Sequence, residues 1–415
     1  MSYSNGAVKT QYIDTTTFVP NQRCSFEINV KSLALLPNMR LLNLGCDNDT
    51  GATPYSQGVG AVSLIRNIRL MDARTEISGM RNVTPYAFFK NMNRSNEINT
   101  SQDSYFKRNR LGYEVNGLNN KIGHLYEVGD SNTAASGATA TSYLDLRELL
   151  PALKSLPLLP TGVFSNLRLE IEFESRVAQQ ILLKDNVVPT ILRPILAIDY
   201  VDDPNVIKPM MNMLMAGVDW HEIEWDNFQI PAQGSATGTV KTQSKTNSSM
   251  GFRGKTLKRL LIQKQLVDRT PTVSAQTVLG FGGVASSQAL LQEALQINLN
   301  GKTVFPGVNG VNRPNAMLGV VVDAYDELQS YPGSNLYKWS KQAELNTDAN
   351  FGGQNAWSCC EIGAQVADLQ VTLSRQNVYD TDALNPTNAA LQINLYGEVH
   401  KAITFNDGSY AITYV

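Results

Sequence analysis

The residues best suited to chemistry lie in one short stretch, "WHEIEWD", at positions 220–226. Beside its two tryptophans stand four groups that titrate or bind metals, namely His221, Glu222, Glu224 and Asp226. A metal site or an acid–base site needs a second cluster to converge on such a group. The other histidines, His124 and His400, occur singly, and no HExxH or HxH spacing is present. We interpret the stretch as a solvated strand face with tryptophan anchors, and predict no metal site.

A second stretch, "GFRGKT" from Gly251 to Thr256, resembles the end of a phosphate-binding loop. That loop requires a glycine five positions before Gly254, where this chain has Ser249. It also requires a buried strand before it and a helix after it, whereas "LKRLLIQ" follows here with a strand-like pattern. We therefore predict a turn between two strands and no nucleotide site.

The cysteines also give no sign of chemistry. Cys24, Cys46, Cys359 and Cys360 contain no CxxC spacing, and the vicinal pair is poorly placed to bridge itself. Four cysteines are too few for a disulfide scaffold in a chain of 415 residues. We expect buried thiols and folding in a reducing, intracellular compartment.

Two charged stretches have both a functional and a structural interpretation. Glu170, Glu172 and Glu174 alternate along one predicted strand, and paired carboxylates can hydrolyse glycosides. Alternation of this kind is more typical of an exposed or interface face. The basic "YFKRNR" at 105–110 is interpreted as a solvated or subunit-pairing patch. The sequence thus predicts no catalytic, cofactor-binding or metal-binding residues, no small-molecule substrate, and a protein that is not an enzyme.

The composition restricts the possible partners. Charged residues are 17% of the chain, below the roughly 25% of an average soluble protein, and the net charge is −2. This balance lacks the excess of positive charge that binding to double-stranded nucleic acid or to an anionic membrane requires, so we expect no sequence-specific nucleic-acid binding. The N-terminal stretch is not apolar enough for a signal peptide, and no apolar run reaches the roughly 20 residues of a transmembrane segment.

Strand patterns dominate the chain. In "NLRLEIEF" (166–173), Leu167, Leu169, Ile171 and Phe173 face one way and the charged residues face the other. The C-terminus is predicted to be a hairpin, "KAITF" and "SYAITYV" around the turn "NDG". Helices are few: "TPYAFFKNM" with Thr84 as N-cap, "LDLRELLPALKSL" and "DAYDELQSY". The polar stretches 129–142 and 232–249 are expected to be loops or weak edge strands.

Four landmarks recur in the same order in the two halves of the chain. "TFVPNQRCSFEINV" is echoed by "FQIPAQGSATGTVKT", "NIRLMDARTEI" by "INLNGKTVF", "NLRLEIEF" by "DLQVTLSR", and "ILAIDYV" by "LQINLYG". The order indicates two similar all-β domains, which we predict at 1–205 and 206–415. Short strands with a few long loops fit an eight-stranded jelly roll in each half, or two tandem jelly rolls in total, with a few short helices in the loops.

Three blocks resemble those of a known family. "YLDLRELLPALKSLPLLPTGVFSNLRLEIEF", "LIRNIRLMDARTEISGMRNVTPYAFF" and the ending "AITFNDGSYAITYV" are similar to blocks in the major capsid proteins of polinton-like viruses and virophages. The resemblance covers mostly the first half of the chain. It implies a double jelly-roll protein that forms homotrimers, the pseudo-hexagonal capsomers of an icosahedral shell.

The resemblance also implies partners, a location and a contact. The partners would be other copies of the chain, neighbouring capsomers, and penton and minor capsid proteins; the protein would be made and assembled in the host cell and reside in the virion. The Leu- and Pro-rich segment before the strand 166–173 would leave the sandwich as an insertion and shape the subunit contact. The residues expected at that contact are Leu149, Leu150, Leu153, Leu156, Leu158, Leu159 and Phe164.

Two other classes of protein stay open on the sequence. One is a carbohydrate- or receptor-binding β-sandwich of a virion, fibre-like or lectin-like, which needs an exposed aromatic platform. Its candidates are Trp220, Trp225, Trp339 and Trp357. The other is an enzyme on a jelly-roll scaffold, a glycoside hydrolase or a cupin, although a cupin needs clustered histidines. A minor capsid or penton protein is a nearer alternative, but such proteins usually have one jelly roll.

Overall fold

The computed structural model describes residues 8–30, 34–47, 62, 64–92, 139–174, 190–231, 241–266, 292–305, 357–378, 391–406 and 408–415. The chain divides into two compact units. Unit 1 comprises residues 1–87, 97–223 and 400–415, and unit 2 comprises residues 88–96 and 224–399. The division follows contacts within the chain. The jelly-roll boundary predicted between residues 205 and 206 stays a prediction.

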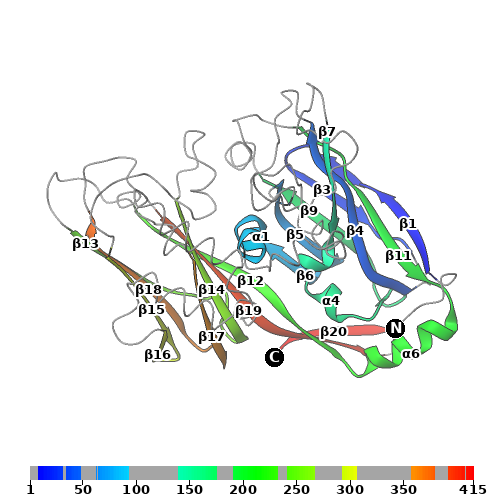
Figure 1. Ribbon diagram of the computed structural model, residues 1–415. Helices are drawn as coiled ribbons and strands as arrows, with labels where there is room; N and C mark the ends of the chain where they lie inside the picture. The colour runs from blue at the N-terminus through cyan, green and yellow to red at the C-terminus, as the bar shows by residue number, and fades with distance from the viewer. Residues whose placement is uncertain are drawn as a thin grey trace. The chain divides into compact units, whose positions relative to one another are not determined.

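The first jelly roll is built from two antiparallel sheets (Figure 1). One sheet has the order β1-β11-β4-β10, and β7 and β8 also pair with β4. Its strands are β1 (Val8–Asp14), β4 (Ala34–Asp47), β7 (Thr139–Asp145), β8 (Leu159–Pro160), β10 (Thr190–Ile191) and β11 (Ile195–Val201). The other sheet has the order β2-β3-β9-β5-β6. Its strands are β2 (Thr17–Val19), β3 (Arg23–Glu27), β5 (Ile65–Asp72), β6 (Thr75–Arg81) and β9 (Leu167–Phe173).

The second jelly roll repeats this plan. One sheet has the order β12-β19-β14-β17, with β20 paired to β19, and the other has the order β13-β18-β15-β16. The first sheet contains β12 (Val218–Ile230), β14 (Thr256–Leu266), β17 (Trp357–Gln365), β19 (Leu391–Asn406) and β20 (Ser409–Tyr414). The second contains β13 (Lys241–Ser248), β15 (Gln292–Leu299), β16 (Lys302–Phe305) and β18 (Leu369–Val378).

The two strand orders correspond element by element. The series β1-β11-β4-β7 recurs as β12-β19-β14-β17, and β3-β9-β5-β6 recurs as β13-β18-β15-β16. Each strand also occupies the same place along the chain in its half. Adjacent strands that are distant in sequence, such as β1 and β11, are the mark of a jelly roll. The predicted fold, two tandem jelly rolls, is therefore confirmed.

Helices are short and few among the described residues. They are α1 (Val83–Met92), the 3₁₀ turn η3 (Leu146–Glu148), α4 (Ala152–Ser155) and α6 (Pro204–Met215). Helix α1 was predicted with Thr84 as its N-cap, but the helix already begins at Val83, one residue before Thr84. The Thr84 hydroxyl instead donates to the carbonyl of Ile65 at 3.4 Å. The predicted helix "DAYDELQSY" and the basic stretch 105–110 lie outside the described residues.

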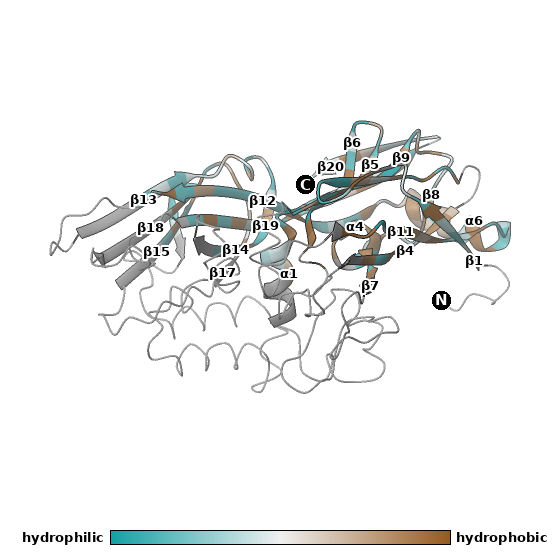
Figure 2. Cartoon of the chain, turned by 90° about the horizontal axis from the view of Figure 1, so that it is seen from above, coloured by the Kyte–Doolittle hydropathy of each residue, from teal (hydrophilic) through white to brown (hydrophobic). Residues whose placement is uncertain are grey.

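The cores follow the alternation seen in the sequence. In β9 all four predicted inward residues are buried, from Leu167 to Phe173. Hydrophobic and hydrophilic bands also follow one another along β12 and β19 (Figure 2), although β12 lacks the regular alternation of β9. The second core is centred on Phe252, Leu260, Ile297, Val371 and Leu395. Burial of such side chains contributes roughly 1.5–3 kcal/mol each to the free energy of folding.

The C-terminal hairpin forms as predicted. Strands β19 and β20 pair from Lys401↔Tyr414 to Asn406↔Ser409, which leaves a two-residue turn. Gly408 in that turn has φ +78°, a conformation that glycine adopts without steric cost. Both strands of this hairpin belong to unit 1 from His400 onward.

Candidate functional site

The stretch "WHEIEWD" lies on β12, which separates its side chains onto opposite faces. Trp220 and Glu222 are buried, whereas His221 is exposed. The expectation of a solvated face is therefore wrong for Glu222, which is 2% exposed. The sequence could not indicate this burial, because the covering groups come from strands distant along the chain.

Glu222 is held by hydrogen bonds on both carboxylate oxygens. Oε1 accepts from the Ser78 hydroxyl at 3.0 Å and from the backbone amide of Gly79 at 3.2 Å. Oε2 accepts from the Trp220 indole N–H at 2.8 Å. The Lys401 ammonium lies 3.7 Å from Oε2. Both oxygens of the carboxylate are thus bonded to, or paired with, groups of the protein itself.

Lys401 completes the cluster from β19. Its side chain is 4% exposed, its Nζ donates to the Ile77 carbonyl at 2.8 Å, and Nζ lies 5.7 Å from the Trp220 ring centre. Burial raises the pKa of Glu222 to about 7, although the Lys401 charge and the hydrogen bonds oppose the rise. A perturbed carboxylate can indicate catalysis, but this one is enclosed by protein. The cluster joins β12, β19 and β6 within unit 1.

Next to the cluster, the structure brings together two histidines that the sequence left apart. The rings of His221 and His400 stack with their centres 5.6 Å apart, and His400 Nε2 lies 3.6 Å from Asp219 Oδ2. The pairing of β12 with β19 creates this contact, so no local motif could reveal it. Within the part of the chain that the structure describes, no group of three or more His, Cys, Asp or Glu side chains is placed to hold a metal ion.

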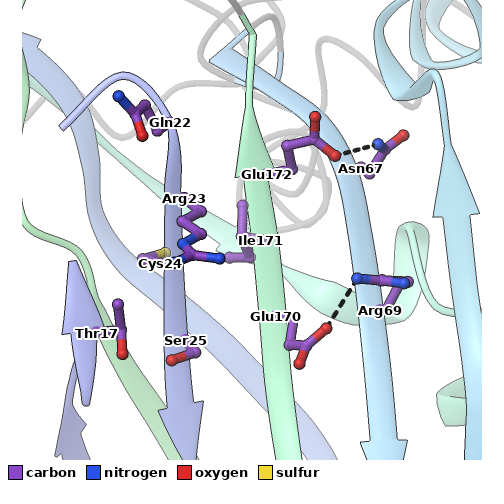
Figure 3. Close-up of a pocket in the computed structure, with 10 residues that line it drawn as sticks. All are labelled: Thr17, Gln22, Arg23, Cys24, Ser25, Asn67, Arg69, Glu170, Ile171 and Glu172. Atoms are coloured by element: carbon purple, nitrogen blue, oxygen red, sulfur yellow. Dashed lines mark hydrogen bonds and ion pairs between the residues drawn. The ribbon is translucent and has the colours of Figure 1, made fainter. Parts of the chain in front are cut away.

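A hollow of about 630 Å³ lies over the β3, β9 and β5 strands (Figure 3). Glu170 and Glu172 point toward this hollow, but both are paired. Arg69 Nη2 donates to Glu170 at 2.9 Å, and Asn67 Nδ2 donates to Glu172 at 2.6 Å. Glu174, the third acid of the alternating series, is buried instead. These pairings favour a structural charge ladder across the sheet over a pair of catalytic carboxylates.

The Leu- and Pro-rich segment lies inside the first jelly roll. All seven residues that we expected at a subunit contact are buried in the single chain, between 0% and 7% exposed: Leu149, Leu150, Leu153, Leu156, Leu158, Leu159 and Phe164. The segment comprises η3, α4 and β8, and β8 pairs with the beginning of β4. Since these side chains are covered within one chain, any role at a subunit contact would be indirect, and that role stays a prediction.

Phe164 has a specific partner within unit 1. Its ring packs edge-on against Tyr410 at 5.1 Å and against Phe405 at 6.3 Å, both in the C-terminal hairpin. The Tyr410 hydroxyl donates to Asp72 at 2.8 Å, and burial together with this bond raises the pKa of Tyr410 to about 12. The hairpin is therefore fastened to β5 and to the loop before β9.

The remaining motifs are structural where they are described. Residues 249–255 connect β13 to β14, so "GFRGKT" is the turn between two strands that we predicted. Cys24 is buried, and desolvation raises the pKa of its thiol to about 12, so it is a poor nucleophile. Trp220 is 4% exposed and cannot belong to an exposed aromatic platform. His124 and Trp339 lie outside the described residues.

Sequence comparison and structure comparison give different results. No protein-family model matches the sequence, and no curated protein matches it. Solved structures do match. PBCV-1 VP54, in a crystal structure fitted into a reconstruction of the virophage Sputnik, is 13% identical, with a TM-score of 0.56 over 100% of this chain and 99% of that one. The mavirus major capsid protein is 9% identical, with a TM-score of 0.54 over 100% and 91% of the two chains. The Faustovirus major capsid protein is 6% identical, with a TM-score of 0.53 over 98% and 92%.

The chain has the double jelly-roll fold. The similarity to these viral proteins extends over both jelly rolls, because at least 98% of this chain is covered in each case. This agrees with the repeated strand order. Among the described residues of the double jelly roll, no helix is long and apolar enough to cross a membrane.

Proposed function

We propose that this protein is the major capsid protein of an icosahedral virus. Three copies would form a pseudo-hexagonal capsomer, and capsomers would tile into the shell with penton and minor capsid proteins. The protein would be made and assembled in the host cell and would act in the virion as a structural component, not as an enzyme.

The observation that carries the proposal is the duplicated jelly roll, shared over the whole chain with the mavirus and Faustovirus major capsid proteins. Two similar domains per chain and a three-fold axis give six near-equivalent edges, which suit hexagonal tiling. The low charge of the chain is also compatible with a protein that covers much of its surface with neighbours.

The described titratable clusters support a structural role. Glu222 and Lys401 are enclosed, and Glu170 and Glu172 are paired with neighbours on the same sheet. The lectin-like alternative finds no support in Trp220, since that residue is buried.

The solution mass of the purified protein tests the proposal. Three chains of 45.6 kDa give about 137 kDa, and light scattering should find this mass over a range of concentrations. A glycan array on the same sample tests the carbohydrate-binding alternative. A monomer of 45.6 kDa that binds glycans would contradict the capsid proposal.

A further inference from the structure

The repeated strand order gives every strand of one jelly roll a counterpart in the other. The first strands are β1 and β12, and the last strands are β11 and β19. The hairpin β5–β6 corresponds to the hairpin β15–β16. In each hairpin the residue after the first strand has φ +51°, Ala73 in one and Asn300 in the other. Both turns therefore begin with a left-handed residue, although the β15–β16 turn adds a second one at Gly301, with φ +79°.

Within unit 1, the β5–β6 hairpin contacts the beginning of β12 and the end of β19. Glu222 on β12 accepts hydrogen bonds from Ser78 and Gly79 on β6. Lys401 on β19 donates to the carbonyl of Ile77, also on β6. This contact is buried, since Glu222 is 2% exposed.

The strands that correspond to β12 and β6 are β1 and β16, and both are largely exposed in the single chain where their side chains are described. Strand β1 exposes most of its length, with Lys9 to Tyr12 and Asp14 exposed, and Tyr12 is 67% exposed. On the other side, Lys302 and Thr303 at the start of β16 are also exposed. An edge strand with an exposed aromatic side chain is a surface that proteins usually cover.

We propose that the β15–β16 hairpin of one copy holds strand β1 of the next copy, in the way that the β5–β6 hairpin holds β12 within unit 1. The occupant of the exposed β1 surface is thus a second copy of this chain. The inference deepens the proposed capsomer, on which it rests, by naming the strands that meet between copies.

Such a contact is heterologous, because β1 of one copy meets a different surface of the next. Heterologous contacts form a ring when the rotation between copies closes, and otherwise an open filament. With two jelly rolls in each chain, three copies place six jelly rolls around the ring. If the contact between copies has the geometry of the contact within a chain, the ring closes at three copies. Every β1 strand and every β15–β16 hairpin is then covered by a neighbouring copy.

Cysteine cross-linking tests the contact. The variant Tyr12→Cys/Thr303→Cys is treated with a short bismaleimide and resolved on a denaturing gel. Both positions are exposed, so the substitutions should leave folding intact, which thermal melting checks. Each single variant is a control for the native cysteines. The matched control pair is Met213→Cys/Thr303→Cys, since Met213 is also well exposed, at 50%, but lies on α6.

We expect the Tyr12/Thr303 pair to give covalent dimers and trimers, and the controls to stay monomeric on the gel. If light scattering finds a trimer but the Tyr12/Thr303 pair links no better than the Met213/Thr303 pair, the strand assignment is wrong while the capsomer proposal stands. If light scattering finds only monomer, both the assignment and the capsomer proposal fail.

Discussion

Glu222 illustrates how one carboxylate can serve structure in a position that would otherwise suggest catalysis. It has a raised pKa, a lysine partner and a neighbouring pair of histidines. Yet its oxygens are fully occupied by Ser78, Gly79 and Trp220. The sequence indicated the unusual density of polar groups in "WHEIEWD". It could not indicate their role, because Lys401 lies on β19 and Ser78 on β6, both of which are far from β12 along the chain.

The raised pKa of Glu222 predicts a pH-dependent stability. The folded state holds a proton on Glu222 up to about pH 7, whereas the unfolded chain releases it near 4.5. Stability from this group is therefore full below about pH 4.5 and is lost as the pH rises through 7. The full loss is on the order of 3 kcal/mol in the free energy of unfolding.

The variant Glu222→Gln removes this titration, so its urea midpoint should fall less than that of the wild type between pH 5 and pH 8. The exposed-face control Glu172→Gln should keep the wild-type profile. Identical pH profiles for Glu222→Gln and the wild type would show that Glu222 does not titrate in this range.

Lys401→Met should destabilise the protein strongly. Removing one partner of a buried ion pair leaves an uncompensated charge and costs about 3–5 kcal/mol in the free energy of unfolding. The loss should be larger at pH 8 than at pH 5, because Glu222 is protonated at the lower pH. Denaturant unfolding of the double variant Glu222→Gln/Lys401→Met should show a loss in the free energy of unfolding that is smaller than the sum of the losses in the two single variants. Strict additivity would refute the coupling.

At the scale of elements, the alternation of β9 and the hairpin β19–β20 could be predicted because both depend on local patterns. The role of the Leu- and Pro-rich segment could not. A leucine covered by its own chain and a leucine covered by a partner have the same sequence signature. Only the structure shows that the leucines from Leu149 to Leu159 are buried within the single chain. The N-cap of α1 was misplaced for a similar reason, since Thr84 is bonded to Ile65 on β5.

Leu153→Ala should therefore destabilise the folded chain itself. Leu153 is fully buried in α4, and such truncations cost about 2–5 kcal/mol in the free energy of unfolding. Its exposed neighbour provides the control: Lys154→Ala should change stability by less than about 0.5 kcal/mol. Chemical denaturation at low protein concentration separates folding from association. If the denaturation midpoint of Leu153→Ala equals that of the wild type, the segment does not stabilise the folded chain, and the result would favour a role at a subunit contact instead.

The turn of the C-terminal hairpin should depend on its glycine. Gly408→Ala places a side chain at φ +78°, at a cost of roughly 1–2 kcal/mol. Gly162→Ala is the matched control, because a Cβ there meets nothing within 4 Å. Thermal melting should show a lower midpoint for Gly408→Ala alone. Equal midpoints would mean that the hairpin contributes little to the stability of unit 1.

At the scale of the whole molecule, the duplication was visible as four weak echoes in a common order. The structure confirms it, since "NIRLMDARTEI" and "INLNGKTVF" both fall in hairpins, β5–β6 and β15–β16. The sequence could not predict that the ends of β12 and β19, with β20, would belong to unit 1. That docking depends on Phe164, Asp72 and Tyr410, which come together only in the folded chain.

Electron microscopy of the purified protein, frozen directly from its main chromatographic peak, tests the central claim most directly. Our account predicts particles with a hexagonal outline, true three-fold symmetry and six upright jelly rolls of two alternating kinds. Single chains, or assemblies in which the two jelly rolls do not alternate around a common axis, would contradict it.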